Sequence, residues 1–198
     1  MRFYTLIIPV AFIIAGCSSA TAPAVNEYTI YPSASMKVSP VHSSKALRLA
    51  STRTIPSLES KNLTYLRLDG ESGNYLYTRW SDTPSLLIER SLNHSLQEQG
   101  LFSAVITSTS SAQADILLES DLHAFYHRFE PGEKSKGIIE ITYRLIDTHT
   151  KLPIASKRFL MTKDASSEDG MGGIKALTEA TQELSKQCTL WIQEKVVQ

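Results

Sequence analysis

The sequence is poor in cysteine and has no excess of charge of either sign. Its 198 residues include two cysteines, Cys17 and Cys188, and 20 basic residues against 20 acidic ones. Without a basic excess, the chain lacks the electrostatic footprint of a nucleic-acid-binding protein and a polybasic patch for an anionic membrane surface. It also lacks an apolar run of the about 20 residues that a membrane-spanning helix requires.

Recognisable catalytic and cofactor motifs are missing as well. The sequence contains neither G-x-S-x-G nor H-E-x-x-H, and the glycines at residues 170–173 lack the spacing of a phosphate-binding loop. His123 and His127 are four residues apart on an expected strand, about 13 Å at Cα, which is too far for one tetrahedral metal site. We therefore expect no catalytic residue, no metal and no cofactor, and we expect that the protein is not an enzyme.

The first 17 residues have the pattern of a bacterial lipoprotein signal peptide. Arg2 precedes an apolar stretch at residues 6–14, and the small residues Ala15 and Gly16 precede Cys17. Cleavage before Cys17 and acylation of its thiol, palmitate included, would anchor the chain to a membrane. An ordinary secretory peptide and an uncleaved anchor are the alternatives. Ser18, rather than an aspartate, follows the cysteine, which favours the outer membrane with the protein facing the periplasm.

Acylation of Cys17 leaves Cys188 without a partner, so we expect no intramolecular disulfide.

Three segments are expected: a signal peptide at residues 1–16, a lipidated N-terminus and flexible tether at residues 17–44, and one folded domain at residues 45–198. Residues 18–26 are rich in Ser, Ala, Thr and Pro, as flexible tethers are. A short strand is expected near residues 28–31, so the compact fold starts at Tyr28 or at Lys45.

Periodicity and helix-end signals predict two helices and several strands. Thr83, Pro84 and Gly100 delimit one helix, and an apolar stripe predicts a second helix over residues 174–196, after a flexible loop at 164–173. Seven strands are expected besides the short one near residues 28–31; the second and third of these seven form a hairpin and the last three an antiparallel meander. Their ranges are 46–51, 63–68, 75–80, 101–106, 115–129, 137–147 and 154–163.

The expected fold class is therefore α+β, with a mostly antiparallel sheet and two helices packed on one face as a two-layer sandwich.

Arg79 and Trp80, at a strand-to-helix junction, are candidate partner-binding residues because Trp and Arg are common anchors of interfaces. The structural alternative for Trp80 is a ring packed under the helix start, with its N–H bonded to a backbone carbonyl. The polar face of the meander, with His123, Phe125 and Arg144, is a second candidate contact surface.

Several short segments together resemble the ABC-type transport auxiliary lipoproteins of the paraquat-inducible protein C type. The resemblance extends over nearly the whole chain after Cys17, although the spacing between Trp80 and Pro84 is longer than in the family and the turn at residues 149–151 lacks the usual Gly. The segments that carry it are the lipobox ending at Cys17, residues 28–30, 47–49, 55–58, 75–80 with 84–87, 100–102 with Val105, 145–147 with 158–159, and the closing helix.

This resemblance implies a non-enzymatic accessory to lipid trafficking between membranes. In such a system an inner-membrane ABC transporter works with mammalian-cell-entry (MCE) domain proteins that form a conduit, and the lipoprotein sits at the outer-membrane end. The resemblance also raises the expectation of a homo-oligomer. Two other functions remain open from the residues alone. One is a lipoprotein that assists outer-membrane assembly or activates a peptidoglycan synthase, and the other is a lipid-binding module with an apolar pocket between helices and sheet.

Overall fold

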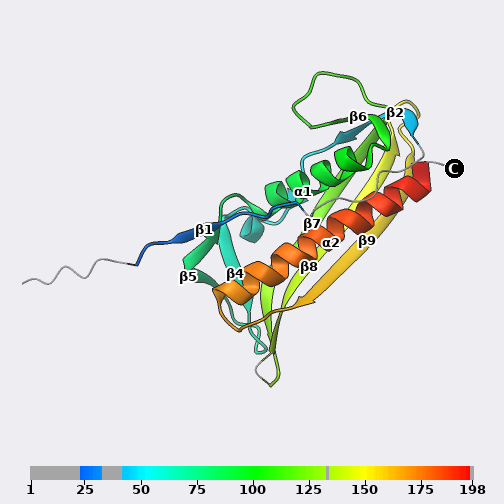
Figure 1. Cartoon of the computed structure of the whole chain (residues 1–198). Coiled ribbons are helices and arrows are strands. Elements are labelled where there is room, and N and C mark those ends of the chain that lie inside the picture. Colours follow the sequence, from blue (N-terminus) through cyan, green and yellow to red (C-terminus); the bar gives the residue numbers. More distant parts are fainter. Residues whose placement is uncertain (1–22, 33–41, 133, 197–198) are drawn as a thin grey trace, which may run out of the picture.

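The computed structural model describes residues 23–32, 42–132 and 134–196 (Figure 1). Within these residues the chain forms a nine-stranded sheet, two α-helices and one short 3₁₀ helix. In chain order the elements are β1 (Asn26–Tyr28), β2 (Ser43–Leu49), β3 (Arg53–Thr54), η1 (Pro56–Leu58), β4 (Asn62–Leu66), β5 (Ser72–Trp80), α1 (Pro84–Gln99), β6 (Phe102–Ile106), β7 (Ile116–Glu130), β8 (Lys134–Asp147), β9 (Pro153–Asp164) and α2 (Gly170–Val196).

The expectation of a mostly antiparallel two-layer sandwich is wrong, because the sheet is mixed. The predicted hairpin of β4 with β5 and the predicted meander of β7, β8 and β9 are antiparallel, as expected. The other five of the eight strand pairings are parallel: β1 with β5, β2 with β6, and β2, β3 and β4 each with β7. Parallel neighbours are joined by long connections, so no local turn signal announces them.

Strand β7 organises this sheet. Along one side it pairs with β8 over almost its whole length. Along the other side it pairs in turn with β2, β3 and β4, three short strands that follow one another in the sequence. One stretch of chain therefore runs beside β7 in three pieces, in the same direction as β7. Strand β1 joins the sheet through β5, and Ile30 just after it is buried, so residues 26–30 are part of the folded unit.

Both helices lie on the same face of the sheet, as Figure 1 shows. Helix α1 has the predicted ends, with Thr83 at the N-cap, Pro84 in the first turn and Gly100 at φ +62° just after the last turn. Its buried stripe includes Leu87, Ile88, Leu92 and Leu96. The stripe of α2 is also as predicted, and its members are all buried: Ile174, Leu177, Thr181, Leu184, Cys188, Trp191 and Ile192.

A ladder of polar side chains joins α1 to α2 inside the core. The Ser185 hydroxyl donates to the Ser91 hydroxyl at 2.8 Å, Ser95 bonds to Thr189 at 3.0 Å, and Gln99 Nε2 donates to Gln193 Oε1 at 3.4 Å. The partners in each pair are 94 residues apart. A constant offset means that the two helices run in the same direction and in register.

Helix α2 begins four residues earlier than predicted, because the glycines at its start are helical rather than part of a flexible loop. The Asp169 carboxylate accepts the Gly172 N–H at 2.8 Å and so caps the first turn. A Cβ on Gly173 would lie 2.9 Å from the His127 ring. Glycine therefore lets the helix start pack directly against β7.

Candidate functional site

The predicted lipidation site, Cys17, lies outside the described residues, so its acylation stays a prediction. Among the residues that the structure describes, no helix is both long and apolar enough to cross a membrane. Cys188, the second cysteine, is buried on α2, and burial raises the pKa of its thiol well above the ordinary value. A buried thiol with a raised pKa is a packing group and a poor nucleophile.

Arg79 and Trp80 are adjacent in β5 but have different surroundings. Trp80 is fully buried, and its ring and that of Phe125 pack edge to face at a centroid distance of 5.6 Å. Its indole N–H has no hydrogen-bond partner among the described residues, so the bond to a backbone carbonyl in the structural alternative is not made. Arg79 is exposed, and its Nε donates to Oε1 of Glu27 at 2.9 Å, which ties β1 to β5.

His123 and Phe125 do not share a face of β7, because the strand contains an irregularity between Leu122 and Ala124. Before it the even-numbered residues point into the core; after it Phe125 and His127 do. His123 is exposed, and its Nε2 lies 3.0 Å from the Thr142 hydroxyl. Phe125 therefore cannot join His123 in a contact surface on the face opposite the helices.

Arg144 does lie on that opposite face, in what we call the outer-face ion network: Arg53, Glu119, Asp121 and Arg144. Arg53 Nε donates to Asp121 Oδ1 at 2.6 Å and its Nη2 to Glu119 Oε2 at 3.3 Å, while Arg144 pairs with the other Asp121 oxygen. The guanidinium of Arg53, then that of Arg144, lowers the pKa of Asp121 to about 2. The network is a fixed charge pattern on an open sheet surface, which is suited to contact with a charged partner surface.

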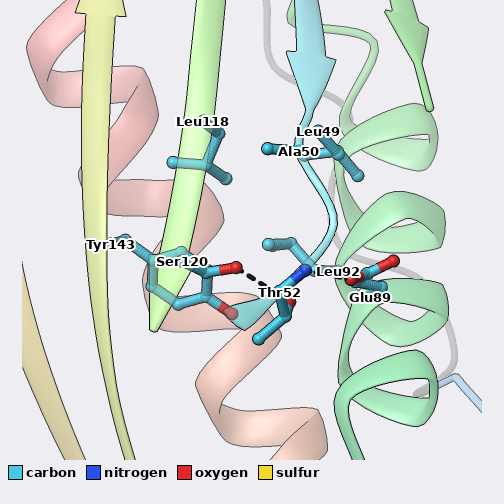
Figure 2. Close-up of a pocket in the computed structure, with 8 residues that line it drawn as sticks. All are labelled: Leu49, Ala50, Thr52, Glu89, Leu92, Leu118, Ser120 and Tyr143. Carbon is cyan, nitrogen blue, oxygen red and sulfur yellow. Dashed lines mark hydrogen bonds between the residues drawn. The ribbon is translucent and has the colours of Figure 1, made fainter. Parts of the chain in front are cut away.

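Figure 2 shows a small pocket between the end of β2, α1, β7 and β8, where the polar side chains of Thr52, Glu89, Ser120 and Tyr143 lie among four apolar ones: Leu49, Ala50, Leu92 and Leu118. The Glu89 carboxylate accepts the Thr52 N–H at 2.5 Å, and the Thr52 and Ser120 hydroxyls are 2.8 Å apart. The Tyr143 hydroxyl, fully buried, has no partner in the described part of the chain, and burial raises its pKa well above the ordinary value.

This pocket has a volume of about 10 Å³. Ligand pockets measure about 300 Å³ or more, so this one has no room for a substrate or an acyl chain. Among the residues that the structure describes, no imidazole lines it to take a proton from Ser120. The carboxylate and hydroxyls hold the loop after β2 against α1 and β7, which is a structural role.

A larger hollow, which the sequence reasoning missed, lies where α2 begins. Four rings gather there, from Tyr65 on β4, Tyr75 on β5, and His127 and Phe129 on β7. His127 is fully buried, its Nδ1 lies 2.8 Å from the Tyr75 hydroxyl, and burial lowers its pKa. The available signal was the alternation of His127 with Phe129 on a strand, which puts both rings on one face.

A family model for the "ABC-type transport auxiliary lipoprotein component" matches residues 28–188. The chain belongs to the ABC-type transport auxiliary lipoprotein family. The resemblance drawn from the short sequence segments is thereby confirmed, and the protein is an auxiliary component of ABC-type transport. No curated protein matches the chain significantly.

Solved structures similar to this family member show the same fold at low sequence identity. Protein XCC0632 from Xanthomonas campestris is 20% identical with a TM-score of 0.75, over 84% of this chain and 96% of that one. An uncharacterised protein is 13% identical with a TM-score of 0.65, over 85% and 99%. The hypothetical protein CT253 from Chlamydia trachomatis is 8% identical with a TM-score of 0.55, over 78% and 98%.

Proposed function

We propose that this protein is a lipid-anchored, non-catalytic adaptor of an intermembrane lipid-transport system, held at the outer membrane by acylated Cys17 and facing the periplasm. The observation that carries the proposal is the family match over residues 28–188, which covers most of the folded unit. The lipobox at Cys17 supports the anchor. The proposed partner is the MCE-domain protein that works with the ABC transporter.

The proposed contact surface is the sheet face opposite the helices. His123 is exposed there beside the outer-face ion network, and Arg158 pairs with Glu140 on the neighbouring strands. Arg53 pairs with two carboxylates and Asp121 with two arginines, so these charges keep their arrangement better than singly paired ones do. A partner with the complementary pattern would be selected by it. An adaptor needs such a surface and a tether, and needs no catalytic group.

Cross-linking in intact cells tests the partner. A photo-reactive amino acid is placed at His123, and at Leu190, an exposed residue of α2, as the matched control. We expect His123 to capture an MCE-domain protein and Leu190 not to. Capture of an outer-membrane assembly factor or of a peptidoglycan synthase at His123 would instead support the alternative functions.

Charge reversal tests the surface itself. Arg144→Glu is compared with Arg90→Glu, since Arg90 is also an exposed arginine in an ion pair, with Asp82 at 2.8 Å on the helix side. We expect Arg144→Glu to reduce recovery of the partner in pull-downs from solubilised membranes and Arg90→Glu to leave it unchanged. Equal recovery with both variants, at unchanged thermal stability, would exclude this face as the contact surface.

Mass measurement of the native protein tests the anchor. The expected mass is that of a chain beginning at Cys17 with its thiol and N-terminus acylated. Cys17→Ser should release the protein from membranes, and density separation of the two membranes should place the unaltered protein in the outer-membrane fraction. An intact N-terminus, or an unmodified thiol at residue 17, would contradict the proposal.

A further inference from the structure

The hollow at the start of α2 has aromatic walls and an open mouth. Tyr65, Tyr75 and Phe129 come from three different strands and line a volume of about 630 Å³, together with residues of the β4–β5 turn and the loop before α2. Tyr65 meets Tyr75 at a centroid distance of 5.4 Å and Phe129 at 6.1 Å, both edge to face. The hydrogen bond between the Tyr75 hydroxyl and Nδ1 of buried His127 fixes one wall.

A cation already rests on these rings. The guanidinium carbon of Arg67 lies 5.5 Å from the centroid of Tyr65 and 5.4 Å from that of Phe129, within the range of a cation–π contact. Arg67 is loosely held. Its side chain is 53% exposed, and the side chain of its ion-pair partner Glu71, at 3.3 Å, is 60% exposed. Exposed pairs of this kind contribute little, so another cation can replace Arg67 at small cost.

The charge around the hollow also favours a cation. Asp69 and Glu168 line it and Glu71 pairs with Arg67, so among the described residues three carboxylates accompany the one guanidinium of the lining. Burial is the main reason that the pKa of Tyr75 is raised, to about 12, so that its hydroxyl stays neutral. If Arg67 swings out, a negative hollow with aromatic walls remains, which is the environment that ammonium and guanidinium groups prefer.

We propose that this hollow receives an arginine or lysine side chain of a partner protein, which stacks on Tyr65 and Phe129 in place of Arg67. A protein segment is favoured over a lipid headgroup by the adjoining strand. Leu76 and Tyr77 of β5 are 77% and 48% exposed, and β1 covers β5 only from Thr78 to Trp80 within the described residues. An extended segment can lie along this uncovered edge while its basic side chain enters the hollow.

Nuclear magnetic resonance of the full chain in detergent micelles, with labelled tyrosine rings, tests the proposal. The probe is a blocked Gly/Ser peptide with one central arginine, and the same peptide with glutamine is its control. We expect the arginine peptide to shift the ring resonances of Tyr65 and Tyr75 saturably, and the glutamine peptide to leave them in place. Phe129→Leu, with its fold checked by circular dichroism, should weaken binding of the arginine peptide.

The affinity of the arginine peptide for the Arg67→Gln variant is the decisive measurement. Removing the resident cation frees the rings and leaves more negative charge, so the arginine peptide should bind about fivefold more tightly. Arg90→Gln, at an exposed ion pair on α1, should leave binding unchanged. Weaker binding by Arg67→Gln, no saturable shift at millimolar peptide, or the same ring shifts with phosphatidylethanolamine vesicles in place of peptide would each overturn the proposal.

Discussion

Replacing Asp121 with asparagine measures how much the outer-face ion network stabilises the fold. The Asp121 carboxylate accepts a hydrogen bond from Arg53 at 2.6 Å and also pairs with Arg144. These partners, Arg53 first, lower its pKa from the ordinary value of 3.8 to about 2. A difference of this size corresponds to at most about 2.4 kcal/mol of stability at neutral pH.

The expected loss is smaller than this limit, because both partners reach solvent. The side chains of Arg53 and Arg144 are 56% and 39% exposed, and exposed ion pairs contribute about 0.2–1 kcal/mol each. We therefore expect Asp121→Asn to lower the free energy of unfolding by about 1 kcal/mol at neutral pH. Since the folded pKa lies below the unfolded one, this contribution is complete above about pH 4 and disappears as the pH falls through about 2.

Urea unfolding followed by circular dichroism over a pH series checks this expectation. The difference between the unaltered protein and Asp121→Asn should shrink toward zero on the acid side, and Asp164→Asn, at an exposed aspartate at the end of β9, should show a smaller difference throughout. A difference that stays the same at every pH would refute the electrostatic account, because a change in packing does not depend on protonation.

Three other changes probe the helix–sheet interface. Gly137→Ala should destabilise the protein by about 1–3 kcal/mol in urea unfolding, because the added Cβ would lie 2.8 Å from the backbone at Ala176 and Leu177. An unchanged free energy of unfolding would mean that α2 can move away from β8. Ser185→Ala should lower the free energy of unfolding by about 1 kcal/mol. The double change Ser91→Ala with Ser185→Ala should lower it by less than the sum of the two single changes, since either change alone already breaks the hydrogen bond. Strict additivity would show that the two hydroxyls are not coupled. Burial lowers the pKa of His127 below 6.5, so thermal stability should fall as the pH drops below about 6.5, and His127→Phe should reduce that fall. The imidazolium would face Tyr75, Phe129 and the carboxylate of Asp169. An unchanged pH profile in His127→Phe would show that the pKa of His127 is the same in the folded and unfolded states.

Local signals in the sequence were sufficient for elements that end at recognisable residues. Thr83, Pro84 and Gly100 mark the limits of α1, and the turn with Gly70 at φ +88° lies between the paired strands β4 and β5. The buried stripe of α2 follows from the 3.6-residue period alone. In each case the information lies within a few residues of the feature that it predicts.

Strand direction could not be predicted in this way. Whether β2 runs parallel or antiparallel to β7 depends on the path of the roughly 70 residues between them, and the alternation of Leu47 with Leu49 is the same in both cases. The glycine-rich start of α2 was misread for a related reason. Gly170, Gly172 and Gly173 disfavour a helix by propensity. They are helical nonetheless, at positions where a Cβ would collide with Thr78, Ser167 and His127, and those neighbours are distant in the sequence or lie in the preceding loop.

The irregularity at His123 is a third feature that local sequence signals do not predict, and it determines which face of β7 each candidate residue lies on. No glycine or proline marks it, so a period of two, continued through residue 123, puts His123, Phe125 and His127 together on the outer face. One extra residue in β7 instead leaves His123 outside and turns Phe125 against Trp80 and His127 against α2. The same shift puts Phe129 on the helix side, where it becomes a wall of the hollow. A single local change of register thus separates two proposed contact regions, a charged one before the irregularity and an aromatic one after it, on opposite faces of the same strand.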